Sequence, residues 1–375
     1  MTSLAFDIAI IGAGMAGASA AYELAGEKSV VLLEMEEHPG YHTTGRSAAF
    51  YSEIYGGPVI RALSTASRGF FEAPPRGFAE VELLAPSGSL FIAREDQLAS
   101  LDAMYEELSP SGKIERREAA FALEKVDILN PDRIAACLWE PGAREIEVHE
   151  LHQGFLRGAK EKGARLLCNA PVRALSRSAG AWRIAAGDAE ITAPVVINAA
   201  GAWGDKVAEM AGCASIGLAP MRRSACILPP PEGRGAVKFP LVIDVDEEFY
   251  FKSDAGNILL SLAEETPSEP CDAFAEDMDI AIAVDRFETA TRMQVRRVLR
   301  TWAGLRTFSK DRSFVMGFDP EAEGFFWLVG QGGYGIQTAP AAGRCAAALA
   351  LGKSLPADVA ALGVKEAALS PARFR

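Results

Sequence analysis

The chain of 375 residues carries 38 Lys and Arg against 50 Asp and Glu, a formal net charge of −12, with 49% hydrophobic and 23% charged residues. This composition excludes wholesale disorder, and its 35 glycines without a three-residue period exclude a collagen-like chain. The acidic balance argues against non-specific binding to nucleic acid or to anionic lipid, and the length favours two domains.

The first predicted elements form a βαβ unit. Residues 6–11 (FDIAII) are apolar and rich in β-branched side chains, which predicts a buried strand. An alanine-rich helix over residues 15–25 follows, and then a second buried strand over residues 29–33 that closes at Glu34. Strand, helix and strand within about thirty residues are typical of a parallel sheet.

The middle of the chain alternates helical and strand patterns. Residues 39–47 are turn-rich and then helix-like, and residues 95–108 and 147–163 predict helices. Strands are expected at residues 165–168 and 193–199.

A different pattern begins after Gly217. Short strand candidates at residues 224–228, 241–245, 249–252 and 258–262 predict an antiparallel sheet. Residues 264–279 carry seven acids and are expected to form an exposed loop. A buried strand over residues 325–330 and an alanine-rich helix to about residue 351 complete the pattern.

Two uncharged stretches resemble membrane segments. Residues 8–22 are too short to span a bilayer, and residues 324–343 contain six glycines and Pro340. We expect no integral membrane segment and no signal peptide. The six scattered cysteines form no CxxC pair, which predicts reduced thiols in a cytoplasmic protein, with peripheral contact to the inner membrane face as an alternative.

The strongest motif is a glycine fingerprint between the first strand and the first helix. Gly12 permits a tight turn, Gly14 lets the backbone approach a pyrophosphate, and Gly17 lets the helix pack closely on the strand. Glu34, at the end of the second strand, can bind both ribose hydroxyls, and its charge disfavours the 2′-phosphate of NADP. The motif predicts a dinucleotide site, and FAD and NAD share this half of it.

Two further glycine-rich segments favour FAD. Gly45-Arg46-Ser47 is expected to begin a helix and to hold the other end of a long dinucleotide, although a surface arginine at an ordinary helix start is an open alternative. The turn over residues 330–335 would bring backbone amides to the pyrimidine side of a flavin, unless it serves packing alone. A plain NAD dehydrogenase would leave both segments unexplained.

These motifs occur in a recognisable order: FDIAIIGAGMAGASAAYELA, HTTGRSAAFYSEIYG, VVINAAGAWGD, RRSACIL, FYFK, TWAGLRTF and GQGGYGIQT. Over nearly its whole length the chain resembles the D-amino-acid oxidase superfamily of FAD-dependent oxidoreductases, and within it the bacterial D-amino-acid dehydrogenases, above all D-arginine dehydrogenase. The resemblance implies non-covalent FAD and hydride transfer from Cα of a D-amino acid to flavin N5. The imino acid formed would be hydrolysed to a 2-oxo acid and ammonia, and quinone and oxygen both remain open as electron acceptors.

The resemblance also implies an interleaved fold of class α/β with an α+β insert. A Rossmann-like FAD-binding domain is expected from residues 1–80, 146–216 and 307–375. A second, mainly antiparallel β-sheet domain for the substrate is expected from residues 81–145 and 217–306.

Individual residues receive expected roles from the motifs and the resemblance. Expected cofactor-binding residues are Gly12, Gly14, Met15, Ala16, Gly17, Glu34, Met35, Thr44, Gly45, Arg46, Ser47, Ala48, Val172, Ala200, Gly201, Trp203, Gly304, Arg306, Gly332, Gly333, Tyr334, Gly335, Ile336 and Gln337. Expected catalytic residues are Tyr55, Arg223, Tyr250 and Arg306. Expected substrate-binding residues are Phe50, Ser52, Ser89, Leu241, Ile243, Gly333 and Gln337.

The carboxylate of an amino-acid substrate favours a bidentate arginine, and Arg306 is the first candidate. Arg223 is the second, with a solvated surface pair of Arg222 and Arg223 as the alternative. Tyr55 and Tyr250 are expected to wall the site, although half-buried core tyrosines would show the same pattern.

Two departures from D-arginine dehydrogenase bear on the substrate. Phe50 stands where that enzyme has a histidine, and Ser89 stands where it has an acid for the guanidinium group. We therefore expect an apolar or small polar D-amino acid to be preferred to D-arginine. Alternatives are a secondary amino acid of the sarcosine or proline type, a 2-hydroxy acid, and a catalytically silent flavin-binding protein.

Four histidines remain to be placed. His149 and His152 share one predicted helix, and without a third ligand they are expected to be surface residues rather than a metal site.

Overall fold

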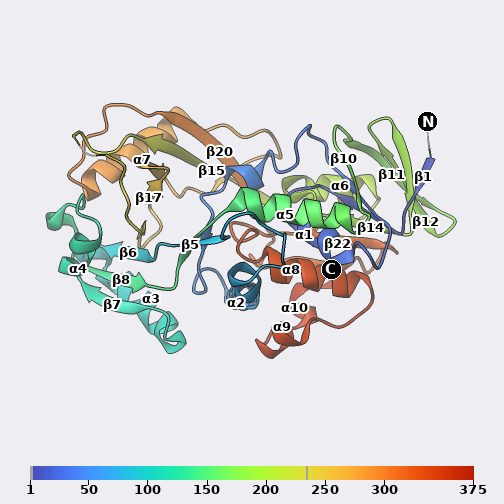
Figure 1. The fold of residues 1–375 in the computed structure, drawn as a ribbon, viewed down its shortest axis with the longest axis horizontal. Helices are drawn as coiled ribbons and strands as arrows, with labels where there is room; N and C mark the ends of the chain where they lie inside the picture. The colour runs from blue at the N-terminus through green and yellow to red at the C-terminus, as the bar shows by residue number, and fades with distance from the viewer. Residues whose placement is uncertain (1–2, 234) are drawn as a thin grey trace.

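The computed structural model describes residues 3–233 and 235–375. It is an elongated mixed α/β molecule, with a parallel sheet and its covering helices towards one end and a large, mainly antiparallel sheet at the other (Figure 1). This arrangement confirms the predicted fold class. The predicted domain boundaries remain a prediction.

The parallel sheet has six strands, in the order β10 (Arg165–Leu167), β3 (Val30–Leu33), β2 (Ile8–Ile11), β14 (Val195–Asn198), β22 (Phe325–Val329) and β21 (Val315–Phe318). Neighbouring strands are parallel except that β21 runs antiparallel to β22. Strands from the beginning, middle and end of the chain therefore lie side by side.

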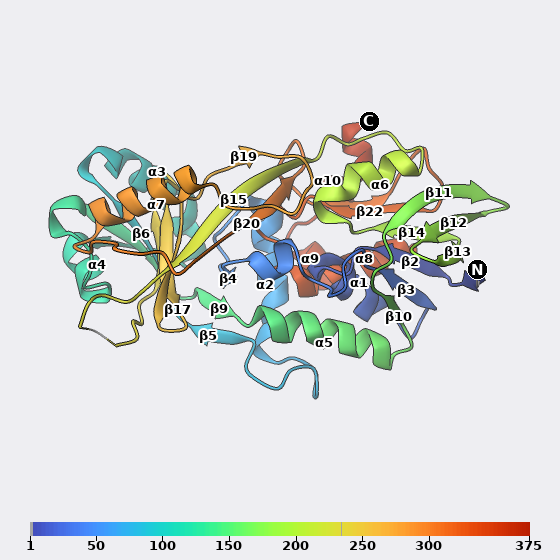
Figure 2. The same ribbon diagram turned by 90° about the horizontal axis from the view of Figure 1, so that it is seen from above.

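Both faces of this sheet are covered, which explains its nearly continuous apolar strands. Ile8 and Ile10 face the helices α1 (Met15–Leu24), α5 (Val148–Glu161) and α8 (Ala339–Ala350), and α1 packs against both α5 and α8. Ala9 and Ile11 face the opposite layer. That layer consists of α6 (Gly204–Met210) and a four-stranded sheet of β1 (Ser3–Ala5), β13 (Ala189–Ala193), β12 (Ala181–Ala186) and β11 (Val172–Ser178) (Figure 2).

The large sheet has nine strands. Eight follow the order β19 (Thr266–Pro267), β15 (Ala219–Leu228), β18 (Asn257–Ser261), β17 (Tyr250–Asp254), β16 (Leu241–Asp244), β6 (Ser89–Ala93), β8 (Ala136–Glu140) and β7 (Glu115–Glu118), and β20 (Arg300–Phe308) pairs with β15. The pairing is antiparallel, as predicted, except between β16 and β6. These two strands are far apart in sequence, so local pattern gave no sign of their parallel pairing.

Alternation along these strands separates two faces. Leu90, Val242 and Phe251 enter a core covered by α7 (Asp277–Ala290) and α4 (Ala119–Lys125), and α3 (Leu98–Leu108) packs on a neighbouring cluster. The alternate residues, Phe91 and Ile243 among them, line a cleft on the other face.

One further sheet and three further helices complete the strands and α-helices of the described residues. They are the three-stranded sheet of β4 (Phe50–Tyr51), β9 (Arg144–Ile146) and β5 (Leu84–Pro86), and the helices α2 (Pro58–Glu72), α9 (Ala357–Ala361) and α10 (Glu366–Leu369). Within the described residues, no helix combines the length and apolarity needed to cross a membrane. The six cysteines are unpaired.

Two local predictions are wrong. Gly45-Arg46-Ser47 does not begin a helix, because a short 3-10 turn over Thr43–Arg46 ends there and the next helix starts at Pro58. Residues 264–279 are not one exposed loop, since they contain β19 and the first turn of α7, and Glu264 is only partly exposed. The density of acids suggested solvent, but Asp272, Glu276 and Asp279 pair with arginines whose side chains are at most 16% exposed.

Candidate active site

A long cleft runs between the parallel sheet and the large sheet. Glu34, Met35 and Val172 line one part of it, and Arg223 and Leu241 line another. Its cavity volume of about 420 Å³ lies within the roughly 300–1,000 Å³ range of small-molecule and cofactor sites. The cleft is continuous from the end of β3 to the strands of the large sheet, so one cavity joins both groups of residues.

Nearly all residues expected at the site lie in the wall of this cleft. The exceptions are Gly17, Gly45 and Tyr334. Gly17 has the packing role that its motif position predicts, because a Cβ there would lie 1.9 Å from the carbonyl oxygen of Gly12. Gly12 itself has φ +99°, which favours glycine.

The acid at the end of β3 is held by the glycine loop. Glu34 is 7% exposed, and its Oε2 accepts a hydrogen bond from the amide of Ala13 at 2.9 Å. Its Oε1 accepts from the amide of Glu36 at 3.1 Å. A carboxylate offers about four acceptor sites, so lone pairs remain for ribose hydroxyls in the cleft.

His152 corrects the expectation that both helix histidines are at the surface. His149 is exposed, but His152 is 3% exposed and donates from Nε2 to the carbonyl of Ala13 at 2.8 Å. Burial lowers the pKa of His152, which favours the neutral ring. His152 thus holds the glycine loop in place through its hydrogen bond to Ala13. The sequence signal for its burial was its position on the apolar face of α5, beside Leu151 and Phe155.

The second motif segment ties the two sheets together. Thr44 Oγ1 accepts from the amide of Met15 at 3.0 Å, and Thr43 Oγ1 donates to the carbonyl of Leu305 at 2.8 Å. Arg46 donates to the carbonyls of Ala273 and Ala303 and pairs with Asp272. Arg46 lines the cleft, but its guanidinium is already committed to these protein partners.

The third glycine segment, residues 330–335, lies beside buried polar atoms that have no hydrogen-bond partner among the described residues. The amide of Gly332 donates to the carbonyl of Thr307 at 2.8 Å. Thr307 Oγ1 and Gln331 Nε2 are buried without a hydrogen-bond partner, and both residues line the cleft. Buried polar atoms are rarely left unpaired, so this wall suits a polar group such as the flavin ring of FAD.

Cationic side chains gather beside this segment. Arg306 is 9% exposed and donates from Nη2 to the hydroxyl of Tyr55 at 2.8 Å. Burial would lower the pKa of Arg306, but the phenol oxygens around it outweigh that effect, and the net direction is upward. The guanidinium therefore stays charged.

Arg223 is not part of a solvated surface pair. Its side chain is 10% exposed, and it donates to the carbonyls of Ala263 at 2.6 Å and Glu264 at 3.0 Å. Glu265 Oε1 lies 3.6 Å from both Arg223 Nη2 and Arg306 Nη1. Arg306 consequently stays the first candidate for a carboxylate ligand, because fewer of its donors are taken than those of Arg223.

The alternation of the large sheet brings the expected substrate residues together. Ser89 lies in β6, Leu241 and Ile243 in β16, and Tyr250 in β17. Sequence reasoning missed Lys252, which follows Tyr250 by two residues on the same face, lines the cleft and lies 3.3 Å from Glu145 Oε1. Phe91 and Ala225 were missed in the same way, and period-two spacing was the signal.

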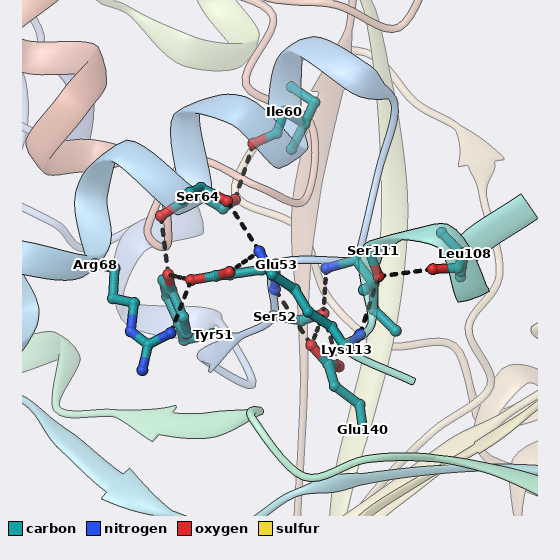
Figure 3. Close-up of polar contacts among 12 residues, drawn as sticks. Tyr51, Ser52, Glu53, Ile60, Ser64, Arg68, Leu108, Ser111, Lys113 and Glu140 are labelled. Atoms are coloured by element: carbon teal, nitrogen blue, oxygen red, sulfur yellow. Dashed lines mark hydrogen bonds and ion pairs between the residues drawn. The ribbon is translucent and has the colours of Figure 1, made fainter. Parts of the chain in front are cut away.

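A buried carboxyl group behind the wall was also missed. Glu140 is 2% exposed, and its Oε2 accepts a hydrogen bond from the hydroxyl of Ser52 at 2.9 Å (Figure 3). The same oxygen accepts from the hydroxyl of Ser89 at 2.9 Å. Burial raises the pKa of Glu140 to about 7. No local motif marks this residue, because it meets its partners only in the folded chain.

Comparison with known proteins gives a family. Residues 7–349 match the family model described as DAO, FAD dependent oxidoreductase. Human mitochondrial dimethylglycine dehydrogenase is 27% identical over 259 residues, 67% of this chain and 29% of that protein. Mouse mitochondrial sarcosine dehydrogenase is 27% identical over 347 residues, 85% of this chain and 37% of that protein. The chain thus spans about three tenths to two fifths of the length of these two relatives.

Solved structures show the same fold. Glycine oxidase from Geobacillus kaustophilus superimposes with a TM-score of 0.82 at 20% identity, covering 94% of this chain and 99% of that one. L-proline dehydrogenase from P. horikoshii gives 0.82 at 23% identity, covering 100% and 98%. Since the family model spans most of the chain, the protein belongs to the DAO family of FAD-dependent oxidoreductases, and its cofactor is FAD.

Proposed function

We propose that this protein oxidises the Cα–N bond of a small, uncharged-side-chain amino acid, with secondary amino acids of the sarcosine or proline type as the leading substrate class. The observation that carries the proposal is the buried Arg306 with the Tyr55 hydroxyl at its side in the wall of the cleft. A charged guanidinium that is largely shielded from solvent is suited to binding a carboxylate.

The substrate class is supported by other side chains in the wall of the same cleft. Phe50, Leu241 and Ile243 offer apolar surface, while Ser52 and Ser89 offer neutral hydroxyls. Relatives named for dimethylglycine and sarcosine, and a structural neighbour named for L-proline, favour substituted amines over primary D-amino acids. We therefore place the secondary amino acid ahead of the D-amino acid expected from motifs alone.

In the proposed reaction, Arg306 and Tyr55 hold the carboxylate, with Tyr250 as a further wall of the pocket. FAD supplies the acceptor for the hydride that leaves Cα. The chain supplies orientation, because a fixed carboxylate restricts the position of Cα and of the amine. The amine must lose its extra proton first, and water then hydrolyses the imine product.

A D-amino acid is the second candidate, since the HTTGRSAA and GQGGYGIQT segments favour it. D-arginine is expected to be a poor substrate. Ser89 stands where D-arginine dehydrogenase has an acid, so this position offers no carboxylate to the guanidinium group of D-arginine. The nearby Glu140 already accepts hydrogen bonds from Ser52 and Ser89.

The test is anaerobic reduction of the bound flavin by a substrate panel. It contains sarcosine, N,N-dimethylglycine, L-proline, glycine, D-alanine, D-methionine, D-arginine and DL-lactate, and the bleaching rate is measured for each. The highest kcat/KM for a secondary or tertiary amine supports the proposal. A D-amino acid or lactate at the top replaces the proposed substrate class, and a flavin that no compound bleaches favours a silent flavin-binding protein.

A further inference from the structure

Glu140 connects the substrate wall to a buried polar network. It ends β8 and lies directly across the ladder from Ser89 in β6. Oε2 accepts from Ser89 Oγ and Ser52 Oγ, and Oε1 accepts from the amide of Glu53 at 3.3 Å. Both serines line the cleft, whereas Glu140 is not part of its wall.

The same network reaches the glycine-rich segment of the site. The amide of Ser52 donates to Gln337 Oε1 at 3.1 Å, and Gln337 Nε2 donates to Ser64 Oγ at 2.9 Å. Gln337 follows the turn that contains Gly333, which packs on Arg306. These contacts fix Ser52 between the carboxyl group of Glu140 and Gln337 at the end of the glycine-rich turn.

The electrostatic surroundings of Glu140 lack a direct counter-charge. Within the described residues, no lysine or arginine pairs with it, and the ionisable side chain that faces it is Glu53. Glu53 has its own cations, since it pairs with Lys113 and lies 3.7 Å from Arg68. The remaining partners of Glu140 are neutral hydroxyls and one amide. Burial disfavours the ionised carboxylate and these hydrogen bonds favour it, so the protonated and ionised forms are close in free energy near pH 7.

We propose that Glu140 is a positioning residue that takes up the proton of the substrate ammonium group through the hydroxyl of Ser52. This inference rests on the proposed function, because it assumes an amine bound beside Ser52. Ionised Glu140 orients the Ser52 O–H towards itself. Ser52 Oγ also accepts from the amide of Ile54 at 3.3 Å, so one lone pair of this oxygen is left to accept the ammonium proton.

The step balances without any added reactant. An N–H bond of the ammonium breaks and a new O–H bond forms on Ser52 Oγ, while the original Ser52 O–H breaks and its proton moves to Glu140 Oε2. The products are a neutral amine and a neutral carboxylic acid. No electrons are transferred, and the amine is then ready to lose hydride from Cα.

The central test compares the pH dependence of kcat/KM in the FAD-loaded wild type and Glu140→Gln, with the best substrate of the panel. The glutamine accepts the Ser52 hydrogen bond but cannot take the proton. We expect the rising limb of the wild-type profile near pH 7, and a shift of that limb by more than about one pH unit towards the pKa of the free amine in the variant. At pH 7 the variant would then be slower by about tenfold or more, and the two would converge at high pH.

Glu53→Gln is the matched control. It also neutralises a buried carboxylate of this network, but its side chain makes no hydrogen bond to Ser52 or Ser89. Because the charge of Glu53 raises the pKa of Glu140, its loss should move the limb slightly to lower pH, in the direction opposite to that of Glu140→Gln. Flavin content and the melting temperature of each variant report whether the fold is kept. Parallel profiles for the wild type and folded Glu140→Gln would overturn the proposal.

A second measurement needs neither turnover nor a stable variant. Infrared spectra of the wild-type holoenzyme between pH 5 and 9 should show a protonated carboxyl band that disappears with a midpoint near pH 7, and addition of substrate to fully reduced enzyme should increase that band. Absence of any such titrating band would overturn the proposal. A wild type that no amine reduces would instead disprove the proposed function, so the two failures are distinguishable.

Discussion

Gly333 and Arg306 are matched so closely that a Cβ on residue 333 would lie 1.6 Å from Nη2 of the arginine. The glycine-rich turn therefore does more than expose backbone amides, because its missing side chain makes the space in which the guanidinium lies. This contact joins the third glycine segment to the proposed carboxylate site.

Gly333→Ala is expected to displace Arg306 while leaving FAD bound. A displacement of about 1 Å can cost about 100-fold in rate, so kcat/KM should fall by about that factor. Gly69→Ala is the control, because residue 69 is exposed in α2 and a Cβ there meets nothing within 4 Å. Stopped-flow reduction of the flavin measures the effect, and wild-type kinetics in Gly333→Ala would contradict this placement of Arg306.

The parts of the fold that were predictable depend on local pattern. The glycine fingerprint with its two apolar strands indicated the βαβ unit. Four of the nine strands of the large sheet, β15, β16, β17 and β18, followed from short strand patterns between turns, whereas the other five were not predicted. The cleft wall was partly predictable for the same reason, since residues two apart on a strand share a face.

The unpredicted features depend on contacts between distant segments. His152 is buried because it meets the carbonyl of Ala13, 139 residues away. Glu140 bonds to Ser52, 88 residues away, and to Ser89, 51 residues away. The helical period places His152 on the apolar face of α5 but does not indicate its partner, and no periodic or motif signal marks Glu140. Only the folded arrangement therefore shows their roles.

Arg306 and Arg223 should differ in their contributions to substrate binding. Arg306→Lys loses the planar fork beside Tyr55, and since hydrogen bonds to charged groups contribute about 1.5–3 kcal/mol, kcat/KM should fall by about 10- to 150-fold. Arg223→Lys should cost less than about tenfold, because the carbonyls of Ala263 and Glu264 already occupy donors of Arg223. Steady-state kinetics on the preferred substrate give both values, and a larger loss in Arg223→Lys would reverse the assignment.

Glu34→Gln is expected to weaken FAD binding without changing the reaction of saturated enzyme. Glu34 accepts from the amides of both Ala13 and Glu36, and a glutamine can accept at only one of its two terminal atoms. A loss of about 1–2 kcal/mol corresponds to a rise in Kd for FAD of about 5- to 30-fold. Fluorescence titration of apoprotein with FAD measures it, with Glu37→Gln, whose side chain is 77% exposed, as the control. Equal affinities in the two variants would remove Glu34 from the cofactor site.

The buried carboxyl group of Glu140 should also make stability depend on pH, with a sign that follows from its pKa. Burial raises the pKa of Glu140 from 4.5 to about 7, so between these values the folded protein binds more protons than the unfolded chain. The free energy of unfolding of the wild type, relative to Glu140→Gln, should therefore be constant below about pH 4.5, fall as pH rises towards 7, and level off above it. The total change is on the order of 3 kcal/mol, because each pKa unit corresponds to about 1.4 kcal/mol. Urea unfolding of both holoenzymes at fixed FAD concentration between pH 5 and 8 measures the difference, and since every other ionisable group is shared, its pH dependence isolates this carboxyl group. A difference that grew with pH would mean that the folded protein stabilises the ionised form of Glu140.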